Sequence, residues 1–239
     1  MLDPHIVKSY DEQLLKLHNI VNEMGELALR QFDASIKALV DRDPAQAAQA
    51  IDTESRIDTL EHAANEQVIR LLALRAPVAD DLRVVVTGLK IASTLESIAD
   101  YAASMAERAI QLAEIAKVPS SRSLSRMASL VHDLLSEVME AYRGNDFHKA
   151  LEVWHRDKEV DAQYSSLFRE LLTYMMEDTR NVAPCSHMMF VAKHVERIGD
   201  LTTNIGEMVY FLSTGETLTG ERPKGDTSSY EVGDGPIIG

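Results

Sequence analysis

Apolar residues recur at helical spacing along most of this chain, and short polar breaks separate the long stretches. One stripe near the C-terminal end consists of Val191, Ile198, Leu201, Ile205, Val209 and Leu212. A similar stripe about 100 residues earlier consists of Ile91, Leu95, Ile98, Ala102, Met105 and Ala109. Such spacing is typical of an amphipathic helix that packs one face on a core. The pattern therefore predicts a protein built from long helices.

The polar breaks divide the pattern into six predicted helices, which cover about 6–40, 44–75, 80–117, 121–143, 146–178 and 184–213. Proline at Pro77 and Pro119 ends two of them, because proline disrupts a helix interior. Asp43 before Pro44 is an N-cap signal. Gly144 is predicted to follow the fourth helix as its C′ residue, and Asn145 or Asp146 to cap the fifth. A turn is expected at 181–184.

The two halves of the chain match helix by helix, with an offset of 103 residues between the second and fifth segments and 100 between the third and sixth. The sequence therefore predicts an all-α fold of two tandem, pseudo-symmetric three-helix bundles, at 1–118 and 119–215. Residues 216–239 are rich in Gly, Pro, Ser, Thr and Asp and are expected to form a flexible tail. Because three helices bury only a modest core, we expect the two halves to pack together.

Pairs of acidic residues at i, i+4 spacing repeat in both halves. Like charges at this spacing destabilise a helix by a few tenths of a kcal/mol per pair, and a hard cation would offset that repulsion. The pairs are Glu54/Asp58, Glu96/Asp100, Asp157/Asp161 and Glu196/Asp200, and Glu107 and Glu207 continue the third and sixth segments.

The phase of these acids relative to the apolar stripes predicts where they lie. On the third and sixth segments they stand opposite the apolar stripe, and on the second and fifth they flank it. A metal site built from them is therefore expected at the surface or in a groove rather than buried. A solvated face is the alternative for any single pair, but the repetition in both halves favours a cation site.

Composition and charge narrow the class of protein. The chain has 239 residues, 45% hydrophobic and 5% aromatic, and a formal net charge of −14. A nucleic-acid partner is not expected, because no basic surplus exists to neutralise phosphates, whereas the charge suits cations or basic protein surfaces. Cys185 is the only cysteine, so no internal disulfide or cysteine zinc site is possible, and a reducing cytoplasm is expected. Neither a secretory signal nor a transmembrane segment is evident.

Several segments, taken together, resemble the PhoU family, the accessory and regulatory proteins of bacterial phosphate-specific transport systems. They are 171–180 (LLTYMMEDTR), 195–200 (VERIGD) with Asn204-Ile205, 79–83 (ADDLR) and 157–161 (DKEVD). The resemblance extends to about Gly215 and implies two similar three-helix bundles. It also implies an adaptor that links the ATPase subunit of the phosphate ABC transporter to a sensor histidine kinase and represses the phosphate regulon. A homodimer that meets the membrane only through its partners is expected.

The resemblance further implies that surface carboxylate motifs bind divalent or trivalent metal ions, in some members as a multinuclear iron cluster. The metal ligands implied here are Glu54, Asp58, Glu96, Asp100, Asp157, Asp161, Glu196, Asp200, Asn204 and Glu207. The first half departs from the fuller motif, with Ser97, Ala99 and Ser104 where the second half has Arg197, Gly199 and Asn204. We therefore expect the second-half site to be the better one.

The residues also allow other interpretations of the function. A di-iron oxidase or metal-storage protein would need two inward Glu-x-x-His motifs, and only Glu152/His155 is present. No phosphate-binding G-x-x-x-x-G-K-[ST] loop or recognisable nucleophile motif occurs, so catalysis is not expected. A third reading is a scaffold whose surface metals are incidental. His194 is predicted to point away from the acids, and Trp154 to anchor neighbouring helices. Core filling is expected of Met175, Met176, Met188 and Met189.

Overall fold

The computed structural model describes residues 4–75, 77–115 and 121–218. These residues form only helices and connections, which confirms the predicted all-α fold. The helices are α1 (Pro4–Asp41), α2 (Pro44–Arg75), α3 (Asp80–Ala113), α4 (Ser121–Gly144), α5 (Phe147–Glu177) and α6 (Val182–Thr214), with a short 3-10 helix η1 (Thr179–Asn181) before α6. The predicted domain boundary at 118/119 and the tail beyond residue 218 lie outside the described residues.

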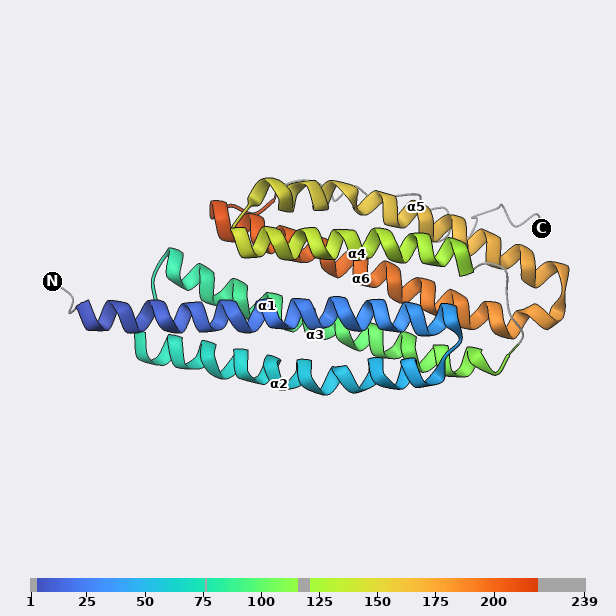
Figure 1. The fold of residues 1–239 in the computed structure, drawn as a ribbon. Coiled ribbons are helices and arrows are strands. Elements are labelled where there is room, and N and C mark those ends of the chain that lie inside the picture. The colour runs from blue at the N-terminus through green and yellow to red at the C-terminus, as the bar shows by residue number, and fades with distance from the viewer. Residues whose placement is uncertain (1–3, 76, 116–120, 219–239) are drawn as a thin grey trace, which may run out of the picture.

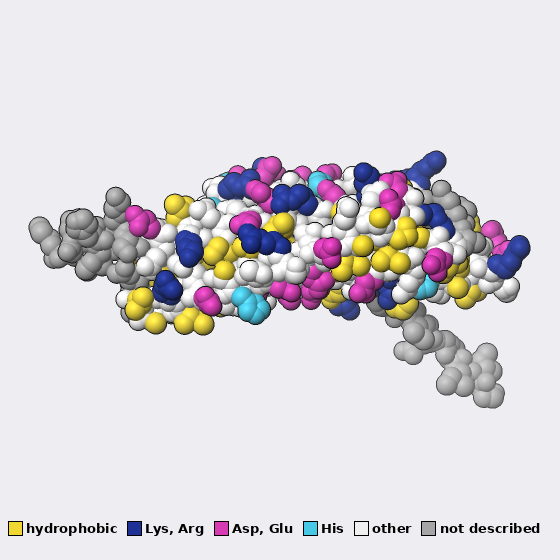
Figure 2. Space-filling view, turned by 60° about the horizontal axis from the view of Figure 1, so that its bottom comes forward, with side chains coloured by type: hydrophobic (Ala, Val, Ile, Leu, Met, Phe, Trp, Pro, Cys, Tyr) yellow, Lys and Arg dark blue, Asp and Glu magenta, His cyan; other side chains and the backbone are white. Residues whose placement is uncertain are grey.

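The helices form two three-helix bundles that lie side by side (Figure 1). α1, α2 and α3 pack on one another, as do α4, α5 and α6. Contacts between the halves run from α3 to α6 and from α1 to α4, so α2 and α5 touch only helices of their own half within the described residues. Figure 2 looks from the side of α2 and shows acidic side chains gathered near the middle of that face.

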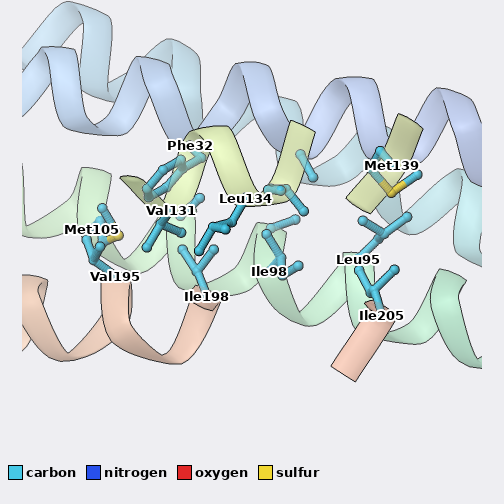
Figure 3. Close-up of a cluster of buried hydrophobic side chains, with 14 of the residues drawn as sticks. Phe32, Leu95, Ile98, Met105, Val131, Leu134, Met139, Val195, Ile198 and Ile205 are labelled. Carbon is cyan, nitrogen blue, oxygen red and sulfur yellow. The ribbon is translucent and has the colours of Figure 1, made fainter. Parts of the chain in front are cut away.

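One hydrophobic core joins the two halves (Figure 3). Ile98 of α3 and Ile198 of α6, at equivalent positions of the repeat, lie close to Phe32 of α1 and Leu134 of α4. None of these four side chains is exposed to solvent. The expectation that two modest bundles pack together is therefore correct, and the interior is shared rather than divided.

Short polar residues define several helix ends as the sequence predicts. The side chain of Asp43 accepts hydrogen bonds from the backbone N–H groups of Ala45 and Gln46, at 2.9 and 3.3 Å. Asp146 caps α5 in the same way, through the N–H groups of His148 and Lys149 at 3.0 and 3.2 Å. Of the two candidates for this cap, Asp146 is therefore the residue used.

Two predicted helix boundaries are wrong. Gly144 is the last residue of α4 rather than its C′ residue, and Asn145 takes the left-handed conformation with φ of 51°. Asparagine tolerates this region better than most residues, so glycine is not needed there. The turn expected at 181–184 is absent, because η1 runs directly into α6. Pro184 lies in the first turn of α6, where its missing N–H has no helical partner to lose.

The larger single side chains follow the predictions with one exception. Trp154 is 8% exposed and packs between α5 and α6, as expected of an anchor. Met188 is buried, but Met176 is 83% exposed and does not fill the core. In the described part of the chain, none of the helices has the length and apolar content needed to cross a membrane.

Candidate functional site

The first-half acids lie along the contact between α2 and α3. Glu54 and Asp58 come from α2, and Glu96, Asp100 and Glu107 from α3. The buried Ile57 of α2 holds that helix against the core one position before Asp58, so its acids stay at the rim. The carboxyl groups of Glu54 and Asp100 lie close enough together for each to act on the pKa of the other. We call these five residues the first acidic cluster; it brings together acids that the sequence placed in two separate motifs.

Burial and mutual repulsion raise the pKa of three carboxyls in this cluster. For Glu54 burial is the main cause, followed by the negative charges of Asp100 and Asp58. Burial is also the main cause of the raised pKa of Glu96, and the charge of Asp100 is the second cause. The pKa of Asp100 is raised mainly by burial and then by the charge of Asp58. A raised carboxyl pKa means that the charged form is destabilised in the folded protein. The first acidic cluster is therefore a concentration of negative charge that a cation would relieve.

The second-half acids are arranged differently. Asp157 of α5 is 3% exposed and accepts a hydrogen bond of 3.0 Å from the hydroxyl of Thr203. Glu196 of α6 is 7% exposed, and the ammonium group of Lys193 lies 2.8 and 2.7 Å from its two carboxylate oxygens. Lys193 also lies 5.3 Å from the centre of the Tyr164 ring. We call Asp157, Asp161, Glu196 and Asp200 the second acidic cluster. The ammonium group of Lys193, on the same helix as Glu196, already lies within it.

The pKa of Glu196 is raised, which follows from this placement. Burial is the main cause, the hydrogen bond from Lys193 opposes it, and the charges of Asp200 and Asp161 add to it. The effect of burial outweighs that of the ammonium group. Asp161 and Asp200 of the second acidic cluster therefore lie close enough to Glu196 to act on its charge.

The expectation of a surface site is wrong for Asp157 and Glu196, which are buried. The apolar stripe of α6 faces the shared core, and we expected the opposite face to meet water. However, α6 packs on α3, α4 and α5, so most of its circumference is covered. A stripe opposite the core is exposed only when the helix has neighbours on one side alone. α6 has neighbours on several sides, so its acidic stripe is partly covered.

Asn204 and Glu207 lie in a different setting from the other predicted ligands. Both line a cavity of about 330 Å³ between α3 and α6, together with Thr87 and Lys90. The carboxylate of Glu207 accepts a hydrogen bond of 2.9 Å from the indole N–H of Trp154. Sequence reasoning missed this use of Glu207, because the pairing of α5 with α6 decides it.

The clusters fit a metal ion in their chemistry more than in their present geometry. Among the described residues, no three Asp, Glu, His or Cys side chains are arranged to hold one ion. The donors are carboxylate oxygens, which suit hard cations such as Ca²⁺, Mg²⁺ or Mn²⁺. Side-chain rotation would therefore have to accompany binding. That the second half holds the better site stays a prediction. Lys193 already neutralises part of the negative charge of the second acidic cluster, which weakens the demand for a cation there.

Residues raised for other chemistries do not form a site. Glu152 and His155 are both exposed on α5, where a di-iron centre inside a bundle would need them to point inward. Cys185 is buried, and burial raises the pKa of its thiol, which disfavours a reactive thiolate. The ring of His194 lies 5.4 Å from that of Tyr101 on α3, so it points to the other half, whereas the sequence predicted only that it points away from the acids.

The family model described as the PhoU domain matches this chain twice, at residues 21–109 and 124–209. The chain belongs to the PhoU family. The two matched ranges fall in the α1–α3 and α4–α6 halves, so each bundle corresponds to one PhoU domain. The family membership confirms the resemblance that the sequence motifs carry.

Relatives of known sequence and structure cover nearly the whole chain. The phosphate-specific transport system accessory protein PhoU homolog of Caulobacter vibrioides is 45% identical, over 94% of this chain and 98% of its own. The homolog of Rhizobium meliloti is 42% identical, over 96% and 97%. The crystal structure of PhoU from Pseudomonas aeruginosa has a TM-score of 0.85 at 34% identity, covering 87% of this chain and 100% of that one. PhoU from Streptococcus pneumoniae, a phosphate transport system regulatory protein, gives a TM-score of 0.79 at 27% identity, over 88% and 100%.

Proposed function

We propose that this protein is a regulatory accessory protein of bacterial phosphate uptake, which acts through protein contacts rather than catalysis. The observation that carries the proposal is similarity over nearly the full length to relatives whose names describe an accessory protein of phosphate-specific transport. Both PhoU domains are present, and the double bundle is that of the related PhoU structures. Nothing in the acidic clusters requires a catalytic role.

In more detail, the protein is a cytoplasmic adaptor between the ATPase subunit of the phosphate ABC transporter and a sensor histidine kinase. It keeps the phosphate regulon repressed when phosphate is ample, and it works as a homodimer that reaches the membrane only through its partners. Nucleic acid is not a partner, because a chain with net charge −14 repels phosphate backbones. These details are the ones that the resemblance to the PhoU family implies, and they go beyond the accessory role that the names of the relatives describe.

Two exposed apolar ends support an adaptor role. Ile69 on α2 is 66% exposed, and Val78 before α3 is 74% exposed. At the equivalent hairpin of the second half, Met176 is 83% exposed and Val182 is 45% exposed. The two hairpins lie at opposite ends of the molecule (Figure 1). Exposed apolar groups of this kind mark interaction sites, so one molecule offers two separated contact surfaces.

The acidic clusters bind divalent or trivalent metal ions, iron among them, in this proposal. Glu54, Asp58, Glu96 and Asp100, with Glu107 beside them, would hold an ion between α2 and α3. In the second half Asp157, Asp161, Glu196 and Asp200 would do so between α5 and α6. The ion would supply positive charge, and the carboxylates, now held on one centre, would fix the spacing of the two helices. The raised pKa values of Glu54, Glu96, Asp100 and Glu196 support such a role.

A reporter assay tests the regulatory role. A strain that lacks its own copy of this protein carries a reporter driven by a phosphate-starvation promoter, and the wild-type gene is returned to it. We expect repression in high phosphate and release in low phosphate. A reporter that is equally active with and without the gene in both media would refute the proposal.

Elemental analysis of protein purified without chelator tests the metal sites separately. Glu54→Gln/Asp100→Asn and Glu196→Gln/Asp200→Asn are compared with wild type, and Asp133→Asn on the exposed face of α4 is the matched control. We expect each double variant to lose the metal of its own cluster and the control to retain both. Metal content that is equal in all four proteins would show that the clusters do not bind it, and would leave the regulatory role untouched.

A further inference from the structure

A basic and aromatic cluster lies on the contact between the two halves. It consists of Tyr101 and Arg108 on α3 and of Phe190, His194 and Arg197 on α6. We propose that this seam cluster binds a small phosphoryl anion, either inorganic phosphate or the phosphate chain of a nucleotide. The proposal stands on the geometry of the seam cluster and does not depend on the proposed function.

Aromatic groups orient both guanidinium groups without neutralising them. The guanidinium carbon of Arg108 lies 4.2 Å from the centre of the Phe190 ring. Arg197 donates a hydrogen bond of 3.1 Å to the hydroxyl of Tyr101, and its guanidinium carbon lies 5.8 Å from the ring centre. Among the described residues, neither arginine forms an ion pair with a carboxylate. Two arginines without an ion-pair partner, on a chain of net charge −14, favour an anion site on this surface.

His194 lies near both arginines. Its ring is half-buried, and its Nδ1 atom is buried without a hydrogen-bond partner among the described residues. The nearest acids named by the charge interactions are Glu196 and Asp200, which act on Arg197. Glu196 is already paired with Lys193, so its charge is only partly available to Arg197.

The arrangement of donors favours a phosphoryl group over other anions. Arginine offers a planar fork of N–H donors that matches phosphate oxygens, and here the two forks come from different helices. Phe190 and Arg197 lie two helical turns apart, about 10 Å at 1.5 Å per residue. Arg108 lies beside Phe190, so the two forks can converge on a single phosphate over His194 or bind successive groups of a phosphate chain. Phe190 is 53% exposed, which leaves ring surface for a nucleotide base.

Such an anion would connect the two halves of the molecule. Arg108 belongs to the first half and Arg197 to the second, so a ligand bound to both stabilises the packing of α3 on α6. Any ligand that binds only this packed state increases its population, with a free energy set by ligand concentration and affinity. A partner that prefers one packing of the halves would then sense the anion, since such coupling is reciprocal.

The test measures binding of three probes to the full chain by calorimetry and thermal shift, in chelator and at constant ionic strength. The probes are inorganic phosphate, pyrophosphate and ATP, with adenosine as the uncharged control. Arg108→Gln/Arg197→Gln is the test variant. Arg70→Gln, an exposed arginine on α2, is the matched control for the loss of charge. Circular dichroism checks that each variant folds, and Arg197→Lys keeps the test valid if the double variant does not.

We expect saturable binding by wild type and by Arg70→Gln, with affinity reduced at least tenfold in the double variant and less in Arg197→Lys. Tight binding of phosphate and pyrophosphate alike would identify inorganic phosphate as the source, and binding of ATP alone would identify a nucleotide. Absence of saturable binding for all three probes, or equal binding by the double variant, would overturn the proposal.

Discussion

Replacing Asp100 by asparagine should stabilise the metal-free protein at neutral pH. The charge of Asp100 acts on both Glu54 and Glu96 and is the largest charge effect on each, and Asp58 acts on Asp100 in turn. Asparagine has a similar shape and a similar helix propensity to aspartate. Its side-chain amide can donate to Glu54, so the hydrogen bond between the two positions is kept while one negative charge is lost.

The size of the effect follows from the number of like-charge neighbours. An unfavourable pair at i, i+4 spacing costs roughly 0.2–0.5 kcal/mol at an exposed position. Asp100 has one like-charged neighbour at this spacing, Glu96, and two more on α2, Glu54 and Asp58. If each pair costs a similar amount, Asp100→Asn gains about 1 kcal/mol at low salt. For a chain of this length about 1 kcal/mol shifts the melting temperature by roughly 2–4 °C. Added salt should reduce the gain, because the charges lie near the surface.

The gain should depend on pH in a defined direction. The folded-state pKa values of Glu54, Glu96 and Asp100 are raised above the ordinary values of 4.5 and 3.8. The folded protein therefore binds protons more readily than the unfolded chain across the window between ordinary and raised values. Wild-type stability contributed by these groups falls as pH rises through that window and recovers as pH is lowered. The advantage of Asp100→Asn should be full at pH 7 and shrink on acidification.

Thermal unfolding in chelator, at several pH values, measures this difference, with Asp133→Asn as the control. Adding a divalent cation at pH 7 should reverse the order, since wild type keeps a ligand that the variant has lost. If Asp100→Asn leaves the melting temperature unchanged or lowers it at pH 7 without metal, the acids do not repel one another as described. The argument for a cation in the first acidic cluster would then fail as well, because it rests on that repulsion.

Three further outcomes follow from the structure. Cation binding at a pH just above the ordinary carboxyl pKa values should release protons, because a bound cation favours the charged forms of Glu54, Glu96 and Asp100, whose pKa values are raised. The release would appear as a buffer-dependent heat in calorimetry, and a heat independent of the buffer would contradict this. Gly206→Ala should lower the free energy of unfolding by about 1–3 kcal/mol, since the added Cβ would lie 3.1 Å from a backbone carbonyl oxygen of α5. In Gly144→Ala the added Cβ meets no atom within 4 Å, so this control should gain up to about 1 kcal/mol. Denaturant titrations measure both changes. Ile198→Ala should cost about 2–5 kcal/mol yet keep one cooperative transition in calorimetry, because the core is shared; two separate transitions would argue for independent halves.

Local signals in the sequence were sufficient for the helices and most of their ends. Asp43 and Asp146 are read correctly as caps, because a cap depends on residues within one turn. Gly144 and Pro184 were misread for the complementary reason. The same residue types occur at the last or first turn of a helix as well as just outside it, and neighbouring packing decides which position is used.

The sequence identified the acids of the first half, but the packing of helices makes them neighbours. Glu54 and Asp100 lie on different helices, and the contact of α2 with α3 brings them together. By contrast, the role of Glu207 as an acceptor for Trp154 could not be read from spacing. Its equivalent Glu107 acts on Glu54 instead, so one position of the repeat has two different environments.

The sequence by itself determined the all-helical class, the twofold repeat, the family and the identity of the acidic residues. These properties are encoded in periodicity and in short motifs, which act over a few residues. Only the tertiary structure decided that Asp157 and Glu196 are buried, and that Lys193 neutralises part of the second acidic cluster. It also decided that Arg108 and Arg197 each contact an aromatic side chain of the other half. Each of these depends on how many neighbours a helix has around its circumference. Periodicity defines the face that a helix turns to its main core, but the packing of α6 on α3, α4 and α5 decides what covers the remaining faces.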